Sequence, residues 1–461
     1  MIKLPDDFVR KYQKLLGKDE ANKLFTAIKS QPTKKGYRIN SLKENKQVSY
    51  NTQSHIPVIP NAFYGEISGH DPEWISGTVY SQDPSAMFPS YIINAKPGER
   101  VLDLCAAPGG KSTAIAEQLQ SSGLLVANEI SPSRAKVLRE NLERWGVTNA
   151  LITNDKPENL TSQFPRFFDK ILVDAPCSGE GMFRKDQQAI EYWSQDYVMN
   201  CQERQKKILT AAVKMLKPEG TLVYSTCTFS PEENEEIISW LSQKFELEIL
   251  PIELGTNQVA KGQPDWADHN KELANTVRFW PTAAIGEGQF VAKLKLPANP
   301  GMSMPGSRKE NKKRKRRLAN IAPNKAEIKL IAAILDQFNL PAALLNWRSD
   351  CLIRNNHVFI PAQDTTGLHV RILTNGIELG LLKKNRFEPG HQLAMVLAAQ
   401  KQTRIINLTA NSYSSYLHGE AIKVNTDLKG FVLVSYHNFI LGFGKVANQI
   451  LKNYYPKGLR F

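Results

Sequence analysis

The sequence predicts an α/β protein with a Rossmann-like, mostly parallel sheet at its centre and a smaller α+β region on either side. Short apolar runs alternate with helical patterns between residues 76 and 296, which is typical of a doubly wound sheet. Turn residues such as Pro218-Glu219-Gly220 separate these runs. Polar and reactive side chains follow several runs directly, where open α/β sheets bind their ligands.

The central region, 76–296, carries the expected strands and helices in alternation. The helices show an apolar stripe at helical spacing, and the strands are short and largely apolar. The expected strands cover residues 101–105, 124–128, 150–153, 170–175, 221–225 and 288–296, and the expected helices cover residues 112–120, 134–146 and 203–217.

The region before the sheet, 1–75, is expected to be a small RNA-binding, ferredoxin-like domain. Apolar residues between 8 and 28 lie close to helical spacing, which predicts helix there. A following stretch combines cations, an aromatic ring and an amide, which suits either an RNA backbone or a solvated turn: Lys34, Lys35, Tyr37, Arg38 and Asn40.

The segment 297–325 is interpreted as a basic linker, because it is rich in glycine and proline and then almost wholly basic. A solvated tether and a phosphate-binding segment are both open. Residues 326–385 are expected to form a first C-terminal domain that starts with a helix. Residues 386–461, rich in glycine, basic residues and aromatics, are expected to form a binding domain.

The composition favours a polyanionic partner and a reducing compartment. The 461 residues include 59 Lys and Arg against 45 Asp and Glu, a formal net charge of +14, which favours nucleic acid. Five cysteines occur at spacings that match no zinc pattern, so we expect no metal. We found neither the apolar core of a signal peptide nor a run of about 20 apolar residues. A cytoplasmic location with free thiols and no membrane contact is therefore expected.

The first motif is CAAPGGKS, residues 105–112, between an expected strand and an expected helix. Glycines allow a tight turn, and the start of a helix presents free N–H groups to a ligand. The motif is neither GxGxxG nor a Walker loop, so it indicates a nucleotide-like ligand without naming it. The candidate binding residues are Cys105, Ala106, Ala107, Pro108, Gly109, Gly110 and Lys111.

Two acids follow the next two expected strands. Glu129 lies about twenty residues beyond the glycine loop, where a carboxylate can accept both hydroxyls of a ribose. Asp155 has the same position after the third strand and could bind adenine or cap a helix.

Two cysteines and an acid follow the last two parallel strands. Asp174 ends one strand, with Cys177 three residues later, and Cys227 lies between a strand and a helix start near Pro231. Strands that are consecutive in the sequence are often neighbours in the sheet, so both thiols should face one pocket. A reducing cytoplasm disfavours a disulfide, and two thiols alone bind zinc poorly. We therefore expect nucleophilic chemistry, whereas Cys201 and Cys351 are expected to be merely buried.

These motifs together resemble the Nop/Sun family of RNA cytosine-5 methyltransferases. The resemblance rests on VLDLCAAPGGKS, NEISPSR, DAPCSGEGMFRK and YSTCTFSPEENE, in this order. The final stretch KVANQILKNYYPKGLRF is similar to the tail of bacterial 16S rRNA methyltransferases of the RsmF type, which includes a PUA-like RNA-binding module. PDDFVRKYQKLLG and YRINSLK resemble the leading domain of that group. One departure is Trp280-Pro281-Thr282, where such proteins often carry Trp-Pro-His.

The resemblance implies S-adenosylmethionine as cofactor and 16S rRNA or the small ribosomal subunit as partner of a monomeric enzyme. It implies the methionine end of the cofactor beside residues 105–111, Glu129 on the ribose, Arg134 and Asp155 nearby, and Asp174 between cofactor and base. It also implies Cys227 as the nucleophile and Cys177 as the residue that assists product release.

Three alternatives remain open at this point. A DNA cytosine-5 methyltransferase would use Cys177 as nucleophile. A catalytically silent RNA-binding factor could retain the same fold, although the presence of Asp174, Cys177 and Cys227 together speaks against it. Within the enzyme interpretation, tRNA competes with 16S rRNA as substrate.

Overall fold

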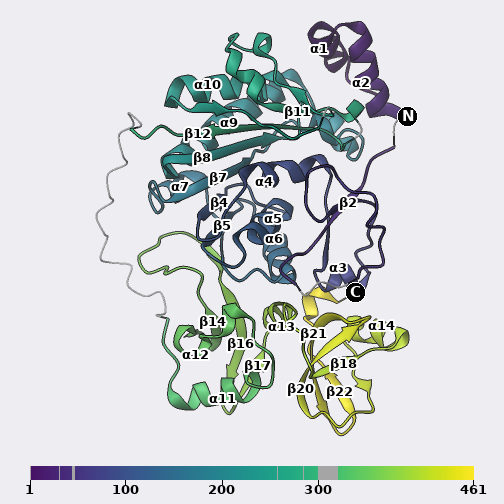
Figure 1. Ribbon diagram of the computed structural model, residues 1–461, viewed down its shortest axis with the longest axis vertical. Helices are drawn as coiled ribbons and strands as arrows, with labels where there is room; N and C mark the ends of the chain where they lie inside the picture. Colours follow the sequence, from purple (N-terminus) through teal and green to yellow (C-terminus); the bar gives the residue numbers. More distant parts are fainter. Residues whose placement is uncertain are drawn as a thin grey trace.

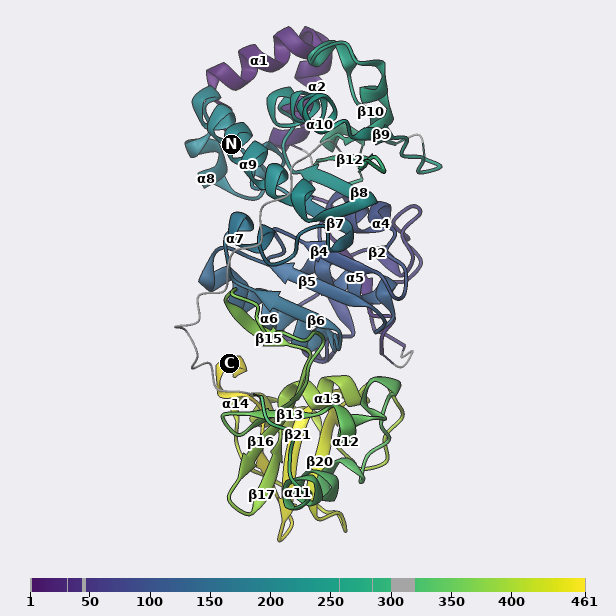
Figure 2. The same ribbon diagram turned by 90° about the vertical axis from the view of Figure 1, so that its left-hand side faces the viewer.

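The computed structural model describes residues 2–30, 32–43, 47–256, 258–283, 285–299 and 320–460. Most of the expected basic linker, 300–319, therefore lies outside the described residues. A large central sheet separates a pair of N-terminal helices at one end of the molecule from the C-terminal modules at the other (Figure 1). The molecule is elongated along this direction (Figure 2).

The central sheet has five neighbouring parallel strands, in the order β8-β7-β4-β5-β6. Antiparallel strands extend it at both edges, with β12 beside β8 and β15 beside β6, and Figure 2 shows these strands stacked in that order. The bounds are β4 (Arg100–Asp103), β5 (Leu124–Asn128), β6 (Ala150–Thr153), β7 (Phe168–Asp174), β8 (Leu216–Thr226), β9 (Glu248–Leu250), β10 (Ala260–Lys261), β11 (Val277–Phe279), β12 (Gln289–Lys295) and β15 (Ile372–Asn375). All six expected strands are present, and the predicted α/β fold class is confirmed.

Helices cover both faces of this sheet, because its strands are apolar on both sides. One core contains side chains of α7, α9 and α10, and the other contains side chains of α4, α5 and α6. Between β4 and β7 the strand order reverses, and this switch point is where open α/β sheets bind ligands. The helices are α4 (Phe88–Ile93), α5 (Gly110–Leu119), α6 (Pro132–Trp145), α7 (Pro157–Thr161), α8 (Gln187–Tyr192), α9 (Gln195–Met215) and α10 (Glu235–Phe245).

The N-terminal region begins with α1 (Asp6–Leu16) and α2 (Lys18–Ser30), which are separated at Gly17. A three-stranded antiparallel sheet follows, with β1 (Gly36–Ile39) between β2 (Ala62–Tyr64) and β3 (Val79–Ser81), and α3 (Pro72–Ile75) precedes β3. Both long helices precede all three strands, whereas a ferredoxin-like domain alternates strands and helices. The expected division at 75/76 also separates β3 from β1, with which it pairs.

The C-terminal region contains a four-stranded sheet, β13-β14-β16-β17, and a five-stranded sheet, β18-β20-β21-β22-β19. The expected division at 385/386 falls in the tight turn between the paired strands β16 and β17, because a polar turn looks the same in a linker and in a hairpin. The elements are α11 (Lys325–Leu335), α12 (Trp347–Asp350), β13 (Leu352–Arg354), β14 (His357–Ile360), β16 (Ile377–Lys383), β17 (Arg386–Pro389), α13 (His391–Leu397), β18 (Ile405–Asn407), α14 (Ala410–His418), β19 (Ile422–Lys423), β20 (Gly430–Tyr436), β21 (Phe439–Ala447) and β22 (Ile450–Asn453).

Candidate functional site

A cavity of about 620 Å³ lies at the carboxyl ends of the five parallel strands. Its position at the edge that contains the switch point follows from the sheet topology, because every parallel strand ends at this edge. Each strand end contributes to the lining: Leu104, Cys105 and Ala107 after β4, Asn128 to Ile130 after β5, Lys156 to Glu158 after β6, Asp174 to Gly179 from β7 onward, and Cys227 after β8.

The two candidate cysteines face each other in this cavity. The Sγ atoms of Cys177 and Cys227 are 3.4 Å apart, because the parallel neighbours β7 and β8 end side by side. Both thiols are free. The hydrogen bond with Cys227, together with burial, raises the pKa of Cys177 well above its ordinary value. Cys177 is therefore a protonated thiol near neutral pH, which makes it a poor nucleophile. Cys201 and Cys351 are buried, as expected.

Asp174 lies beside the thiols and accepts three hydrogen bonds. Lys111 Nζ and Ser225 Oγ donate to it at 2.7 Å each, and Gln289 Nε2 donates at 3.1 Å. Burial alone would lower the pKa of Lys111. The Asp174 carboxylate, Asp103 and Cys227 outweigh burial, so the pKa of Lys111 lies above its ordinary value. Lys111 is thus a permanent cation that interacts with both Asp174 and Cys227.

The glycine loop is only partly exposed to the cavity. Cys105 and Ala107 line it, whereas Ala106, Pro108, Gly109 and Gly110 do not. A Cβ atom on Gly109 would lie 3.3 Å from Leu138 Cδ1 of α6, and one on Gly110 would lie 3.0 Å from Gln82 Cδ. These two glycines therefore allow close packing of α6 and of the residues after β3 against the loop. Burial raises the pKa of Cys105, so its thiol is protonated.

The acids after β5 and β6 differ in their surroundings. Glu129 lines the cavity, where it accepts a hydrogen bond from Ser131 N at 2.8 Å and lies 3.5 Å from Arg134. Arg134 also donates to Ala107 O at 2.7 Å. Asp155 is not among the lining residues. Its carboxylate accepts hydrogen bonds from the neighbouring α7 segment and from the chain before β15: Lys156 N at 2.9 Å, Asn159 Nδ2 at 2.6 Å and Arg371 N at 3.2 Å.

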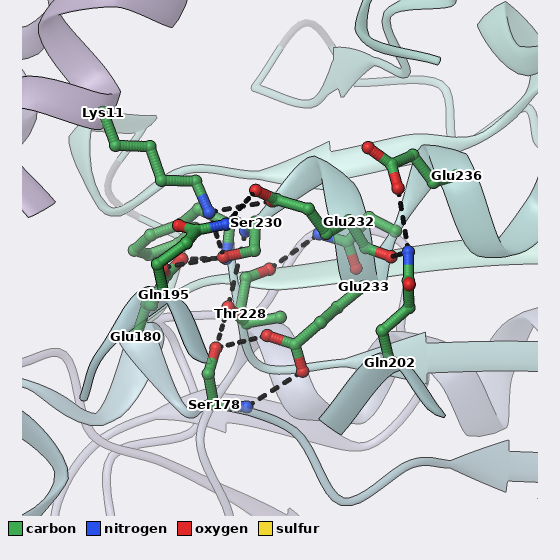
Figure 3. A network of polar contacts seen from close by, with 12 residues as sticks. Lys11, Ser178, Glu180, Gln195, Gln202, Thr228, Ser230, Glu232, Glu233 and Glu236 are labelled. Atoms are coloured by element: carbon green, nitrogen blue, oxygen red, sulfur yellow. Dashed lines mark hydrogen bonds and ion pairs between the residues drawn. The ribbon is translucent and has the colours of Figure 1, made fainter. Parts of the chain in front are cut away.

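A buried polar network that the sequence did not reveal fixes the two cysteine loops against each other (Figure 3). Ser178 and Thr228, the residues after the cysteines, are joined by a hydrogen bond of 2.8 Å between their hydroxyls. Glu233 accepts from Ser178 N at 3.0 Å, from Ser178 Oγ, and from Gln205 Nε2 at 2.8 Å. The expected helix near Pro231 begins as a short 3₁₀ turn, Pro231–Glu233, which turns Glu233 inward.

A second buried acid, Glu180, joins these loops to the N-terminal helix. It accepts hydrogen bonds from Tyr12 Oη at 2.5 Å, Trp193 Nε1 at 2.9 Å, Ser230 Oγ at 2.8 Å and Phe229 N at 2.8 Å. At the surface, Lys11 of α1 forms an ion pair with Glu232 at 2.8 Å, as Figure 3 also shows. Helix α1 is therefore part of the support of both cysteine loops.

Glu233 makes stability depend on pH, because burial raises its pKa from 4.5 to about 7. An acid with a raised pKa in the folded state stabilises the fold below pH 4.5, and this contribution is lost as the pH rises through 7. The difference corresponds to about 3 kcal/mol. We expect Glu233→Gln to weaken the fall in thermal stability between pH 5 and pH 8, measured by Tm at several pH values.

The decline should weaken and not vanish in this variant, because burial also raises the pKa of Asp103 to about 7. Glu253→Gln, at an exposed position, is the matched control and should retain the pH dependence of the unaltered protein. An undiminished decline in Glu233→Gln would contradict the assignment.

Two searches of the described ranges gave no candidates. They contain no group of three or more His, Cys, Asp or Glu side chains that could hold a metal ion. Across the same ranges, no helix combines the length and apolar character needed to cross a membrane.

Four family models match the chain along its length. Residues 90–295 match 16S rRNA methyltransferase RsmB/F, and residues 4–84 match the N-terminal domain of 16S rRNA methyltransferase RsmF. Residues 337–397 match the first C-terminal domain of RsmF rRNA methyltransferase, and residues 403–461 match the RsmF PUA domain.

Relatives of the same kind match over nearly their full length. Ribosomal RNA small subunit methyltransferase F of Vibrio parahaemolyticus is 31% identical, over 99% of this chain and 98% of the relative. The protein of the same name from Vibrio vulnificus is also 31% identical, with the same coverage. This chain belongs to the RsmF family of small-subunit ribosomal RNA methyltransferases, within the broader RsmB/F group.

A solved structure agrees with this assignment. The crystal structure of a methyltransferase homologue from Pyrococcus horikoshii is 28% identical, with a TM-score of 0.53, and covers 64% of this chain and 100% of that one. The expected resemblance to RsmF-type proteins is therefore confirmed.

Proposed function

We propose that this protein transfers a methyl group from S-adenosylmethionine to carbon 5 of a cytosine in 16S rRNA, with Cys227 as the covalent nucleophile. The observation that carries the proposal is the pair of thiols 3.4 Å apart in the cavity that Asp174 also lines. Membership of a small-subunit rRNA methyltransferase family supports the class of substrate. We expect the enzyme to act as a cytoplasmic monomer, on naked 16S rRNA or on the small subunit.

The donor set of the cavity fits a nucleoside cofactor. Glu129 supplies a buried carboxylate that can accept ribose hydroxyls, and Ile130 and Pro157 supply apolar surface for a flat ring. We place the methionine end beside the loop that runs from Cys105 to Lys111, with Arg134 supporting Glu129. Asp155 has the weakest support as an adenine contact, because its carboxylate is already engaged outside the cavity lining. When bound, S-adenosylmethionine supplies an electrophilic methyl group.

Carbon 5 of cytosine is a weak nucleophile, so catalysis starts at carbon 6. The Cys227 thiolate forms a bond to carbon 6, and the electron pair of the carbon 5–carbon 6 double bond moves into the ring as an enamine. Lys111 favours the thiolate electrostatically, and Asp174 lies where it can contact the polar edge of the base. Carbon 5 of the enamine then takes up the methyl group.

The second half of the reaction restores the aromatic ring. A base removes the proton from carbon 5, the electron pair re-forms the double bond, and the bond between carbon 6 and Cys227 breaks. Cys177 retains its own proton, because its pKa is raised, and its sulfur lies 3.4 Å from the leaving sulfur. We assign Cys177 to this release step.

The substrate can be tested with a readout that covers every cytosine of an RNA at once. Bisulfite sequencing of 16S rRNA and tRNA from a deletion strain should show at least one 16S cytosine that loses protection. The purified protein should transfer tritiated methyl groups to RNA from that strain. Lost protection confined to tRNA would instead support a tRNA methyltransferase, and absence of transfer to any RNA would support a catalytically silent RNA-binding factor.

A further inference from the structure

We infer that the α8–α9 side of the cavity binds the RNA strand next to the target cytosine. In this inference, which rests on the proposed function, Tyr192 stacks on a neighbouring base while Arg204 and Lys207 bind phosphates. The cofactor and the two thiols account for the residues at the strand ends. They leave unexplained a part of the cavity whose lining comes from α8 and α9.

The positions of these side chains suit a nucleic acid that lies across the cavity mouth. Tyr192 is the last residue of α8, lines the cavity, and is 71% exposed. Met182, also in the lining, is 37% exposed. Arg204 and Lys207 are three residues apart on α9, so they project from one face of that helix. An exposed ring and two adjacent cations thus border the same opening.

The charges of this border are not neutralised within the part of the chain that the structure describes. Neither Arg204 nor Lys207 has an ion pair or side-chain hydrogen bond there, and both are exposed. By contrast, Lys111 pairs with Asp174, and Arg134 pairs with Glu129. The nearby acid Asp186 is engaged at the start of α8, where Gln188 N donates to it at 2.9 Å.

A phosphodiester strand with unstacked bases matches this combination better than a second small molecule does. Unpaired RNA bases stack on aromatic side chains, and Arg and Lys neutralise the phosphates between them. A target base must also leave its stack to enter the pocket, which leaves its neighbour without a stacking partner. Tyr192 is placed to supply that partner at the rim.

The test compares the full-length protein with Tyr192→Ala, Tyr192→Phe and the double variant Arg204→Ala/Lys207→Ala. We expect Tyr192→Ala and the double variant to raise the KM for 16S rRNA about 10-fold or more. The kcat and the KM for S-adenosylmethionine should stay within about twofold. Tyr192→Phe retains the ring and should restore RNA binding. Each lost phosphate contact to a single strand lowers the salt slope by about 0.7, so the double variant should lose about 1.4.

The matched control is Lys271→Ala/Lys401→Ala, which removes two exposed lysines outside the lining. It should leave the KM for RNA unchanged. Filter binding of a 16S rRNA fragment in parallel makes the test independent of catalysis. Unchanged RNA affinity and salt slope in both rim variants would overturn the inference. If the unaltered protein binds RNA through this rim but transfers no methyl group, the inference stands and the proposed function fails.

Discussion

Cys227→Ala is expected to abolish methyl transfer and covalent capture of RNA, whereas Cys177→Ala is expected to accumulate a covalent protein–RNA complex. Loss of the nucleophile should reduce kcat by at least about 10³-fold. Without Cys177, the adduct forms and leaves slowly, because the thiol that lies 3.4 Å from the leaving sulfur is missing. The measurement is denaturing gel electrophoresis of the protein with 5-fluorocytosine-containing RNA and with unmodified RNA.

The control for this pair is Cys351→Ala, which removes a buried thiol of the C-terminal region. It should retain both turnover and capture. An adduct that survives Cys227→Ala and disappears in Cys177→Ala would contradict the assignment. That result would make Cys177 the nucleophile, as in DNA cytosine-5 methyltransferases.

Lys111→Met is expected to reduce kcat/KM by about 100-fold or more, with partial recovery at higher pH. Lys111 donates to Asp174 at 2.7 Å and interacts electrostatically with Cys227. Without this cation, formation of the Cys227 thiolate requires a higher pH, and Asp174 loses one of its three donors. The measurement is the pH dependence of kcat/KM between pH 6 and pH 10.

Lys136→Met on α6 is the matched control, because this lysine is largely exposed and only 3.9 Å from its partner Glu140. It should retain the activity and the pH profile of the unaltered protein. A Lys111→Met variant with an unshifted pH profile would show that Lys111 acts only through the cofactor loop.

The sequence predicted the fold well where local pattern and topology act together. The six apolar runs of the central region all became strands, because alternation with helical patterns leaves few other arrangements. The meeting of Cys177 and Cys227 followed from one further step, the adjacency of β7 and β8. Short, buried strands and their order are encoded by residues close together in the chain.

The supports of the site could not be predicted in this way. Glu180 and Tyr12 are 168 residues apart, and Glu233 and Ser178 are 55 apart, so no local pattern links them. In the sequence, the acids after Pro231 suggested only a favourable helix start. The structure turns Glu233 inward, where it holds the loop of Cys177. A carboxylate that serves a buried network has the same residue type as one that faces water.

Region boundaries also depended on contacts between distant parts of the chain. The strand β15 comes from the C-terminal region and pairs with β6 of the central sheet, with Asn375 opposite Leu151. Likewise, the turn between β16 and β17 resembled a linker until the pairing of these strands was known. Composition marks where a chain leaves regular structure, and it does not tell which sheet the next strand joins.

The pairing of β15 with β6 has a consequence for how the protein is made and divided. During synthesis, β6 emerges more than 200 residues before its antiparallel neighbour, so its outer edge carries unpaired N–H and C=O groups until β15 follows. A fragment that ends near residue 296 keeps the thiols and the cavity lining but leaves this edge open to pairing with other chains. The C-terminal region therefore shields the catalytic sheet from association, in addition to carrying its own domains.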